Sequence, residues 1–442
     1  MPGVGLLHDD GRVSDDAAAP RPRPRIVVIG GGFGGLTAAK ALGKAPAEVL
    51  LIDRRNHHVF QPLLYQVATA ALSPGDISAP IRWILRHQDN ARVWMGDVTA
   101  IDVTGKSLTL ADGARLTFDY LVVSAGATHA YFGHDEWRRW APGLKTLEDA
   151  LEIRRRVLLA FERAERATDR ADERRLLTFV VVGGGPTGVE LAGALAEISR
   201  HALAHDFRAI DPESARVILI EGGQNLLGSY PEELSAYARK KLERLGVNVW
   251  TRSIVTNVTE GAVHVGQETI EAGTVLWAAG VSASPLGRSL GVPLDRAGRV
   301  LVNPDLSVPG HPDIFVVGDL AALEDGQGGW LPGVAQVAIQ QGQRVASNVK
   351  ARIAGQPTRP FRYRNLGSLA TIGRNSAVAD LPAWRSKGFV AWLFWLFVHV
   401  MNLVGFRNRL SVLTQWAFSY LTYQRSVRLI TFDNGVPPAQ DP

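Results

Sequence analysis

Two glycine clusters contain the residues of this chain that are best suited to chemistry. The first begins at Gly30, in GGGFGG, and the second begins at Gly183, in GGGPTG; each lies between an apolar run and a helical pattern. Glycine lets the backbone approach a pyrophosphate closely, and the N–H groups at the start of a helix point at its oxygens. Each cluster therefore predicts a turn that binds the pyrophosphate of a dinucleotide.

Each glycine cluster is followed by a second apolar run that ends in an acidic residue. EVLLID ends at Asp53, and ARVILIE ends at Glu221. A carboxylate in this position accepts hydrogen bonds from ribose hydroxyls, and it repels the 2′-phosphate that distinguishes NADPH from NADH. No arginine follows Glu221 before Arg239, so we expect the second site to prefer NADH.

The elements that must position these residues occur twice along the chain. Gly126 lies 96 residues after Gly30, and Gly280 lies 97 residues after Gly183, with short strands and turn signals in each interval. A repeat on this scale indicates one architecture used twice. The connection before the second acid is lengthened by residues 199–214, to which the sequence assigns no role.

A third apolar run, HPDIFVV, leads into a Gly-Asp pair at Gly318 and Asp319. Two nucleotide folds closed by such a strand resemble the glutathione-reductase-like flavoproteins. That resemblance implies FAD in the first fold, NAD(P)H in the second, and Asp319 in contact with FAD. The predicted fold class is α/β, with two Rossmann-like dinucleotide-binding domains and a C-terminal helical membrane-anchoring segment.

The composition excludes several kinds of redox centre. The chain has no cysteine, so it has no disulfide, iron–sulfur cluster, thiolate metal site or redox-active dithiol. Electrons that leave a flavin must therefore pass directly to a bound acceptor. His57 and His58 invite a metal interpretation, but no further ligands accompany them, so we expect no metal and a structural or FAD-adjacent role.

The C-terminal part of the chain combines apolar and basic residues. The nineteen residues between Lys387 and Arg407 carry no charge, and the segment from Trp384 to Ile430 has six Lys or Arg and no acid. The net charge of the whole chain is +5, so the remainder sums to −1. Basic charge beside an apolar run favours an anionic bilayer surface over nucleic acid as the partner.

Two helices are expected within this segment. A weakly polar stripe of the first comprises Trp392, Trp395, His399 and Asn402. The apolar face of the second comprises Leu413, Trp416, Ala417, Tyr420 and Leu421, with Ser411, Thr414, Gln415, Ser419 and Thr422 largely opposite. Such a pair favours a monotopic anchor that lies in one leaflet. A tail that spans the bilayer and a dimer interface remain open.

A glutamine pair precedes this segment. Gln336 and Gln340 stand at i and i+4 in GVAQVAIQQG, on one face of an expected helix. An uncharged amide can donate a hydrogen bond to a quinone carbonyl without fixing its charge. Two glutamines on a helix can equally be solvent-exposed, so the pattern alone leaves both possibilities open.

Several motifs together resemble one family, the type II NADH dehydrogenases, which are single-subunit, non-proton-pumping NADH:quinone oxidoreductases. The motifs are GGGFGGL, FQPLLYQVATA, SAGATHAYFG, GGGPTGVELAG, WAAGVSASPL, FVVGDLA, GVAQVAIQQG and FRNRL. The likeness covers about residues 25 to 430 and is closest to actinobacterial members. It implies that Glu190 lies between nicotinamide and flavin, and that Gln336 and Gln340 lie near flavin and quinone. Some members have His where this chain has Ile339, so a proton-donating role at that position is excluded here.

The resemblance also implies the remaining contact residues. Those expected at FAD are Gly30, Gly32, Phe33, Gly34, Gly35, Asp53, Arg54, Val98, Ala125, Gly126, Gly318, Asp319, Ala335 and Gln336. Those expected at NADH are Gly183, Gly185, Pro186, Thr187, Gly188, Glu190, Glu221, Ala279 and Gly280. The catalytic residues that it implies are Glu190, Gln336 and Gln340.

The expected activity is hydride transfer from NADH to FAD, followed by two-electron reduction of a membrane quinone. Actinobacterial likeness suggests menaquinone, and no motif resembles a proton channel. The alternative is a membrane-docked NADH-binding flavoprotein that reduces oxygen or acts as a redox sensor. We expect a homodimer held peripherally on the cytoplasmic face of the plasma membrane, or inner membrane, without a nucleic-acid partner.

The predicted domain limits follow from these assignments. The FAD-binding domain is discontinuous, at residues 25–145 and 295–380, and the NADH-binding domain lies between, at 146–294. Residues 381–430 form the anchoring helices. Residues 1–24 carry four Asp and a Pro-Arg run without the apolar core of a signal peptide, and are expected to be a disordered tail. Residues 431–442 form a second tail.

Overall fold

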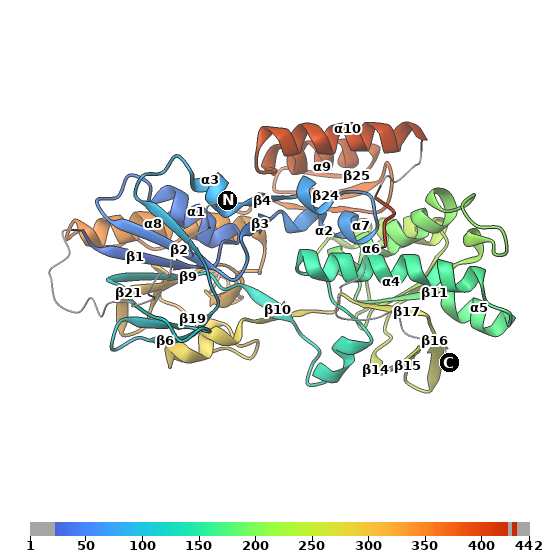
Figure 1. Cartoon of the computed structure of the whole chain (residues 1–442), viewed down its shortest axis with the longest axis horizontal. Coiled ribbons are helices and arrows are strands. Elements are labelled where there is room, and N and C mark those ends of the chain that lie inside the picture. Colours follow the sequence, from blue (N-terminus) through green and yellow to red (C-terminus); the bar gives the residue numbers. More distant parts are fainter. Residues whose placement is uncertain (1–22, 423–426, 431–442) are drawn as a thin grey trace, which may run out of the picture.

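A computed structural model describes residues 23–422 and 427–430 of the chain (Figure 1). Apart from residues 23 and 24, the predicted N-terminal tail lies outside the described residues, and so does the whole predicted C-terminal tail.

The first nucleotide fold is built on a six-stranded sheet in the order β20-β21-β9-β1-β2-β5. In that order the strands are Ser307–Val308, His311–Val316, Tyr120–Val123, Arg25–Ile29, Glu48–Asp53 and Ala91–Met95. The helices α1 (Phe33–Ala41) and α8 (Ala335–Ile353) pack together beside this sheet. A separate antiparallel sheet consists of β6 (Val98–Asp102), β7 (Ser107–Leu110) and β8 (Arg115–Thr117).

The second nucleotide fold has a parallel sheet in the order β13-β12-β11-β17. These strands are Val247–Trp250, Arg216–Ile220, Thr178–Val182 and Thr274–Trp277. Its helices are α4 (Leu147–Glu165), α5 (Arg170–Leu176), α6 (Pro186–Glu197) and α7 (Glu232–Arg244), and a small meander contains β14 (Val255–Thr259), β15 (Ala262–Val265) and β16 (Glu268–Glu271). The central strand β11 is buried throughout, as its continuous apolar sequence requires. The predicted α/β fold with two Rossmann-like domains is confirmed.

The chain crosses between the two domains on a pair of short strands. β10 (Ala127–His129) runs antiparallel to β18 (Val281–Ala283), and Figure 1 shows this pair between the two sheets. Trp137 donates from Nε1 to Asn257 Oδ1 at 3.2 Å, so the segment after β10 already belongs to the NADH side. Leu286 and Leu290 after β18 are buried in the core beneath the FAD-side sheet. We therefore propose that the domains exchange at β10 and β18, before the predicted limits at 145 and 294.

The C-terminal unit starts with a sheet of its own. β23 (Ser368–Thr371), β24 (Ala377–Leu381) and β25 (Trp384–Gly388) are antiparallel neighbours, and α9 (Phe389–Asn402) and α10 (Phe406–Thr422) follow. The predicted division at 380/381 cuts through β24, so we propose a start near Ser368. In Figure 1, α10 and α9 lie along the upper edge of the molecule. Within residues 23–422 and 427–430, no helix is both long enough and apolar enough to cross a bilayer.

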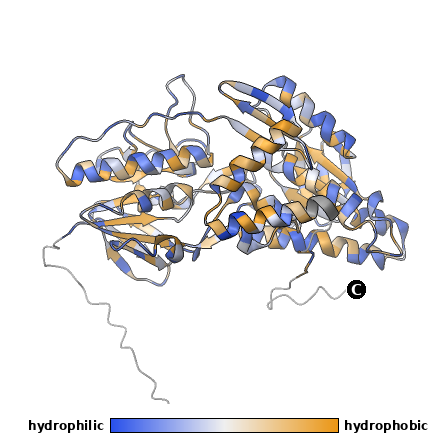
Figure 2. Ribbon diagram, turned by 90° about the horizontal axis from the view of Figure 1, so that it is seen from above, coloured by the Kyte–Doolittle hydropathy of each residue, from blue (hydrophilic) through white to orange (hydrophobic). Residues whose placement is uncertain are grey.

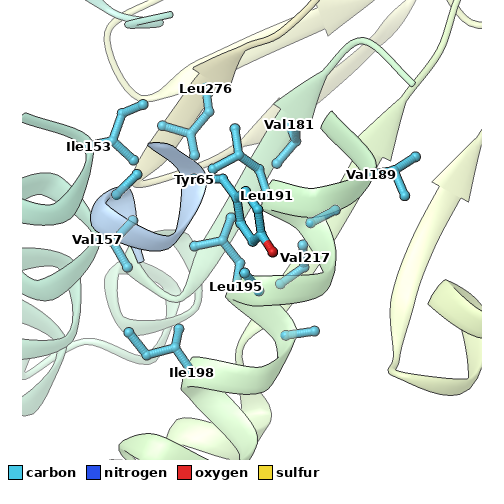
Figure 3. Packing of buried hydrophobic residues seen from close by; sticks show 14 of the residues in the cluster. Tyr65, Ile153, Val157, Val181, Val189, Leu191, Leu195, Ile198, Val217 and Leu276 are labelled. Atoms are coloured by element: carbon cyan, nitrogen blue, oxygen red, sulfur yellow. The ribbon is translucent and has the colours of Figure 1, made fainter. Parts of the chain in front are cut away.

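A segment of the first nucleotide fold, the predicted FAD domain, packs into the second fold, the predicted NADH domain, near this unit. The short helix α2 (Leu64–Ala68) inserts between α4 and α6, and its Tyr65 lies beside Leu191 and Leu195 of α6 (Figure 3). On the other side are Ile153 and Val157 of α4 (Figure 3). One continuous apolar core therefore joins α2, the NADH-binding sheet and the C-terminal unit, which includes the buried Trp395.

The two helices of the FAD domain approach one another through glycine. A Cβ added to Gly342 of α8 would lie 2.3 Å from the carbonyl oxygen of Gly34 in α1. A Cβ on Gly34 would in turn meet the carbonyl oxygen of Ala338 at 3.3 Å. Because no side chain stands between them at these glycines, α8 packs closely against α1, the helix that starts at the first glycine turn.

This contact predicts the effect of Gly342→Ala. Helix propensity alone would make alanine stabilising by about 1 kcal/mol, whereas the overpacking should destabilise by about 1–3 kcal/mol. We expect a lower thermal midpoint and weaker retention of the bound flavin, measured by flavin fluorescence during heating. The matched control is Gly75→Ala, because a Cβ on Gly75 meets nothing within 4 Å. A Gly342→Ala variant more stable than the parent would contradict the close-packing account.

Candidate active site

The first glycine turn is held in a shape that suits a pyrophosphate. Gly30 has a φ of +94°. A Cβ added to Gly35 would lie 1.9 Å from the carbonyl oxygen of Gly30. The N–H of Gly31 donates to Asp53 Oδ2 at 2.6 Å, and the other carboxylate oxygen accepts from Arg55 N at 2.7 Å. His58 Nδ1 lies 2.9 Å from the carbonyl oxygen of Gly31. Only glycine fits the close contact between Gly30 and Gly35, so the turn is shaped to take the pyrophosphate of a dinucleotide.

The second glycine turn repeats the first. Gly183 has a φ of +107°. A Cβ added to Gly188 would lie 1.8 Å from the carbonyl oxygen of Gly183. Glu221 accepts from Gly184 N and from Gly223 N, each at 2.5 Å. The predicted acids Asp53 and Glu221 thus occupy equivalent places, each joining the end of its strand to its glycine turn. The remaining predicted residues of this turn are Gly185, which precedes α6, and Pro186 and Thr187 in its first turn.

Other predicted FAD residues surround the first turn. The side chain of Phe33, at the start of α1, meets the ring of His58 edge-on with centroids 5.1 Å apart. Gly32 precedes α1, and Gly34 and Gly35 lie within it. Arg54 is exposed after β2, and Ala125 and Gly126 follow β9. Val98 begins β6, and Ala335 begins α8. The role of these residues in binding FAD stays a prediction. On the NADH side, Ala279 and Gly280 lie between β17 and β18.

The sequence analysis missed two residues that fix the Gly318–Asp319 turn. Gln341, which is buried, accepts from Gly318 N at 2.7 Å. Lys145 Nζ lies 3.0 Å from Asp319 Oδ2, and both side chains are mostly buried. Gln341 could have been found, because it directly follows Gln340 in the recognised glutamine motif. No local signal pointed to Lys145, which comes from a distant part of the chain.

Both candidate quinone-binding glutamines are bonded to backbone groups. Gln336 donates to Gly367 O at 2.8 Å and accepts from Leu366 N at 3.0 Å. Gln340 donates to Arg364 O at 2.9 Å and accepts from Arg364 N at 3.0 Å. The pair therefore fastens α8 to the segment before β23, and these bonds use one of the two N–H donors of each amide.

Glu190 lies on the wall of a cavity of about 120 Å³. Burial raises the pKa of Glu190 to about 8, because desolvation disfavours the carboxylate. One backbone N–H, from Thr371, faces its Oε1 at 3.5 Å and opposes the shift only weakly. Glu190 therefore carries a proton at neutral pH, as a general acid requires.

The cavity lies where both domains and the C-terminal unit meet. Its lining comprises Tyr65, Gln66, Thr69 and Ala71 from the FAD domain, Glu190, Ala194, Glu197, His201 and Ala202 from the NADH domain, and Thr371, Gly373, Arg374, Trp392, Trp395 and Trp416 from the C-terminal unit. Apart from Glu190, the sequence analysis assigned none of these residues to a site. The recognised stretch FQPLLYQVATA, which contains Tyr65, Gln66 and Thr69, was the available signal.

Aromatic side chains of α9 and α10 close the cavity. Trp395 is 2% exposed and stacks on His399, with ring centroids 4.3 Å apart. Its ring also lies 5.6 Å from that of Trp416, whose Nε1 donates to Gln66 Oε1 at 2.7 Å. Burial lowers the pKa of His399 to about 4, so its imidazole is neutral. Of the predicted weakly polar stripe of α9, Trp392, Trp395 and His399 therefore turn inward, whereas Asn402 is exposed.

Helix α10 is attached to the FAD domain by its polar side. Ser411 Oγ donates to Asp76 Oδ1 at 2.7 Å, and Gln415 Nε2 donates to Asp76 Oδ2 at 2.9 Å. Asn408 donates to Ser78 O at 3.0 Å. Trp416, which the sequence grouped with Leu413 on one apolar face, points inward instead. Ser411 and Gln415 of the polar face therefore pack against protein, whereas polar residues of a helix on a soluble surface usually face water.

The outward side of α9 and α10 is apolar. We call it the C-terminal apolar surface, and its exposed residues are Phe389, Val390, Leu393, Phe397, Met401, Phe406, Leu410, Leu413 and Phe418. Figure 2 views the molecule from above this region and colours much of α9 as hydrophobic. Trp83 of α3 (Ile81–Leu85) continues the surface, because its ring approaches Gly405 and Arg86 lies 4.2 Å above it. Isolated soluble domains rarely expose an apolar patch this extensive.

The two histidines considered for a metal have other partners. His58 faces the glycine turn as described, and His57 Nδ1 lies 2.9 Å from Asn56 Oδ1. Burial lowers the pKa of both imidazoles. In the part of the chain that the structure describes, no three His, Cys, Asp or Glu side chains cluster as metal ligands would.

Comparisons with known proteins agree with this arrangement. A model of the pyridine nucleotide-disulphide oxidoreductase family matches residues 24–342, and a model of the NDH2 C-terminal domain matches residues 365–424. The type II NADH:quinone oxidoreductase Ndh of Mycobacterium tuberculosis is 46% identical over 94% of this chain and 92% of its own length. Its counterpart NdhA from the same organism is 46% identical over 95% and 92%. A solved structure of NDH2 from Plasmodium falciparum in complex with NADH shares the fold, with a TM-score of 0.82 at 22% identity over 93% of this chain and all of that one.

The raised pKa predicts a titration that can be observed directly. In infrared difference spectra the protonated carboxyl band of Glu190 should persist at pH 7 and disappear as the pH rises through about 8. The Glu190→Gln variant should lack this transition. A carboxyl that is already ionised at pH 6 would contradict a buried, proton-holding Glu190.

Proposed function

This chain belongs to the type II NADH:quinone oxidoreductases, and from that premise we propose how it works. FAD occupies the first nucleotide fold and NADH occupies the second. Two electrons then pass to a membrane quinone without proton pumping. The two relatives from an actinobacterium favour menaquinone as the acceptor. One observation carries the proposal. Glu190, beside the NADH turn, and Trp395, whose helix bears the C-terminal apolar surface, line the same cavity.

The protein mainly binds and orients its partners in this proposal. N–H groups of the two glycine turns bind pyrophosphate oxygens, and Asp53 and Glu221 accept from ribose hydroxyls. FAD, when bound, supplies the redox chemistry, because it can accept a hydride and release electrons to a quinone. Glu190 holds a proton on its carboxyl for a quinone oxygen. Gln336 and Gln340 position the segment before β23, and β23 carries Thr371, which lines the cavity with Glu190.

Assay of the purified protein tests this function. It should be yellow and release FAD on denaturation. NADH oxidation should rise severalfold when a quinone is added, and NADPH should be a poor substrate because Glu221 repels its 2′-phosphate. NADH oxidation that only consumes oxygen and ignores added quinone would instead favour the alternative oxidase or sensor.

The C-terminal apolar surface supports a peripheral, monotopic position on the membrane. Its exposed side chains would each contribute about 1 kcal/mol on entering the interface. Arg385 and Arg407 are exposed near its borders and can pair with anionic headgroups. Because NADH is held in the cytoplasm, we place the protein on the cytoplasmic face. A homodimer is part of the proposal, and a second copy could cover some of this surface.

The double variant Phe397→Glu and Phe406→Glu tests the membrane position. Both side chains are exposed, at 60% and 80%, so the fold should persist. Lost burial of about 2 kcal/mol or more should weaken binding to anionic vesicles by about 30-fold or more. Turnover with a long-tailed quinone should fall, whereas ferricyanide reduction should persist. The matched control is Trp330→Glu, because Trp330 is an exposed aromatic residue outside this surface. Unchanged vesicle binding with a lost dimer would assign the surface to self-association.

A further inference from the structure

Four residues of one helix face line the cavity in order. Glu190, Ala194, Glu197 and His201 stand at i, i+4, i+7 and i+11 along α6 and the π-helical turn Ile198–Ala202 that extends it. The rise of 1.5 Å per residue separates the two glutamates by about 10 Å along the axis. The small Ala194 lies between them. His201 is exposed at the far end, so the row runs from a buried carboxyl to the molecular surface.

The space along this row suits water. The cavity lining also includes the polar residues Gln66, Thr69 and Thr371. Trp395 is 2% exposed, and its indole N–H has no acceptor among the described residues. A buried donor of this kind is normally satisfied by water or by a ligand. A cavity volume of about 120 Å³ has room for several waters.

We propose that this cavity is a proton route from the aqueous surface at His201, through Glu197 and bound water, to the carboxyl of Glu190. The inference rests on the proposed quinone reduction at the inner end of the route. The imidazole of His201 is exposed, and its two ring nitrogens can accept and donate hydrogen bonds, which suits it to the entrance. The carboxylate of Glu197 also accepts from the backbone N–H of Arg374, which holds it at the middle of the row.

The stoichiometry of the reaction requires such a route. NADH delivers two electrons and one proton as hydride, whereas reduction of a quinone to quinol forms two O–H bonds. One proton per turnover must therefore come from water. Glu190 gives its proton to a quinone oxygen, and its carboxylate is then reprotonated through the row. The raised pKa of Glu190 favours this reprotonation, because the buried carboxylate binds a proton readily.

The titratable groups beside the two ends of the row leave this direction of transfer intact. Arg374 also lines the cavity, and its backbone N–H binds Glu197 at the middle of the row. Tyr230 faces Glu190 and has its pKa raised by burial and by that carboxyl, so it stays neutral. At the outer end, Arg428 bonds to the carbonyl oxygen of Ala202 and to Asp206. That cation is paired with a carboxylate, so it does not oppose entry of a proton at His201.

Three variants of the flavin-loaded protein test the route. Glu197→Gln retains an acceptor for Arg374 N but cannot relay a proton, and His201→Ala removes the entrance. Ala194→Val narrows the passage without changing any titratable group. Each should slow quinone turnover by about 10²-fold or less, the scale of general acid–base effects, while NADH reduces the flavin at the normal rate in a single turnover. Added imidazole should restore quinone turnover in His201→Ala but not in the other two variants. His205 is exposed and lies outside the cavity, so His205→Ala should turn over quinone as fast as the parent.

A second measurement does not depend on turnover. After a downward pH jump, infrared spectroscopy should show slower reprotonation of Glu190 in all three variants than in the parent and His205→Ala. Unchanged reprotonation and turnover in all three variants would overturn the route. A raised quinone KM with normal reprotonation would show instead that quinone fills the cavity. A parent protein that NADH reduces but quinone does not reoxidise would refute the proposed function, which is a separate outcome.

Discussion

The carboxylate of Asp76 fixes the arrangement on which the rest of the site depends. It is buried, and it accepts hydrogen bonds from Ser411 and Gln415 of α10. Because these bonds hold the polar side of α10 against the FAD domain, the apolar side must face outward. The same orientation brings Trp416 to Gln66 and lets the aromatic side chains of α9 and α10 close the cavity. One interaction therefore determines both the docking surface and the cavity roof.

The C-terminal unit also ties the two nucleotide domains together. Helix α10 is bonded to the FAD domain, whereas residues 427–430 return to the NADH domain, where Arg154 donates to Val427 O at 3.4 Å and Arg428 to Ala202 O at 2.6 Å. Glu190 and Tyr65 come from different domains and meet on the cavity wall. A fixed relation between domains is required if hydride donor and electron acceptor are to reach one flavin from two sides.

Sequence reasoning succeeded where the chemistry is local. The glycine turns, Asp53 and Glu221 lie within single strand–helix–strand units, so spacing alone predicted their arrangement. Sequence reasoning did not predict the contacts between segments that are distant in the chain. Nothing near Asp76 indicates that α10, more than three hundred residues later, would bind it, and Lys145 finds Asp319 only in the folded protein. Amphipathic periodicity grouped Trp416 with Leu413 on one face of α10, but Trp416 turns inward because its indole binds Gln66, a partner elsewhere in the chain.

In the proposed arrangement, the C-terminal apolar surface lies in the bilayer with the cavity beneath it. The chain has no cysteine, so one fluorophore can be attached at Phe397→Cys and another at His205→Cys without competing thiols. In anionic vesicles, lipids brominated along their acyl chains should quench the label at position 397 strongly and the label at position 205 little. Equal quenching of both labels, or quenching of neither while the protein binds and reduces membrane quinone, would contradict the account.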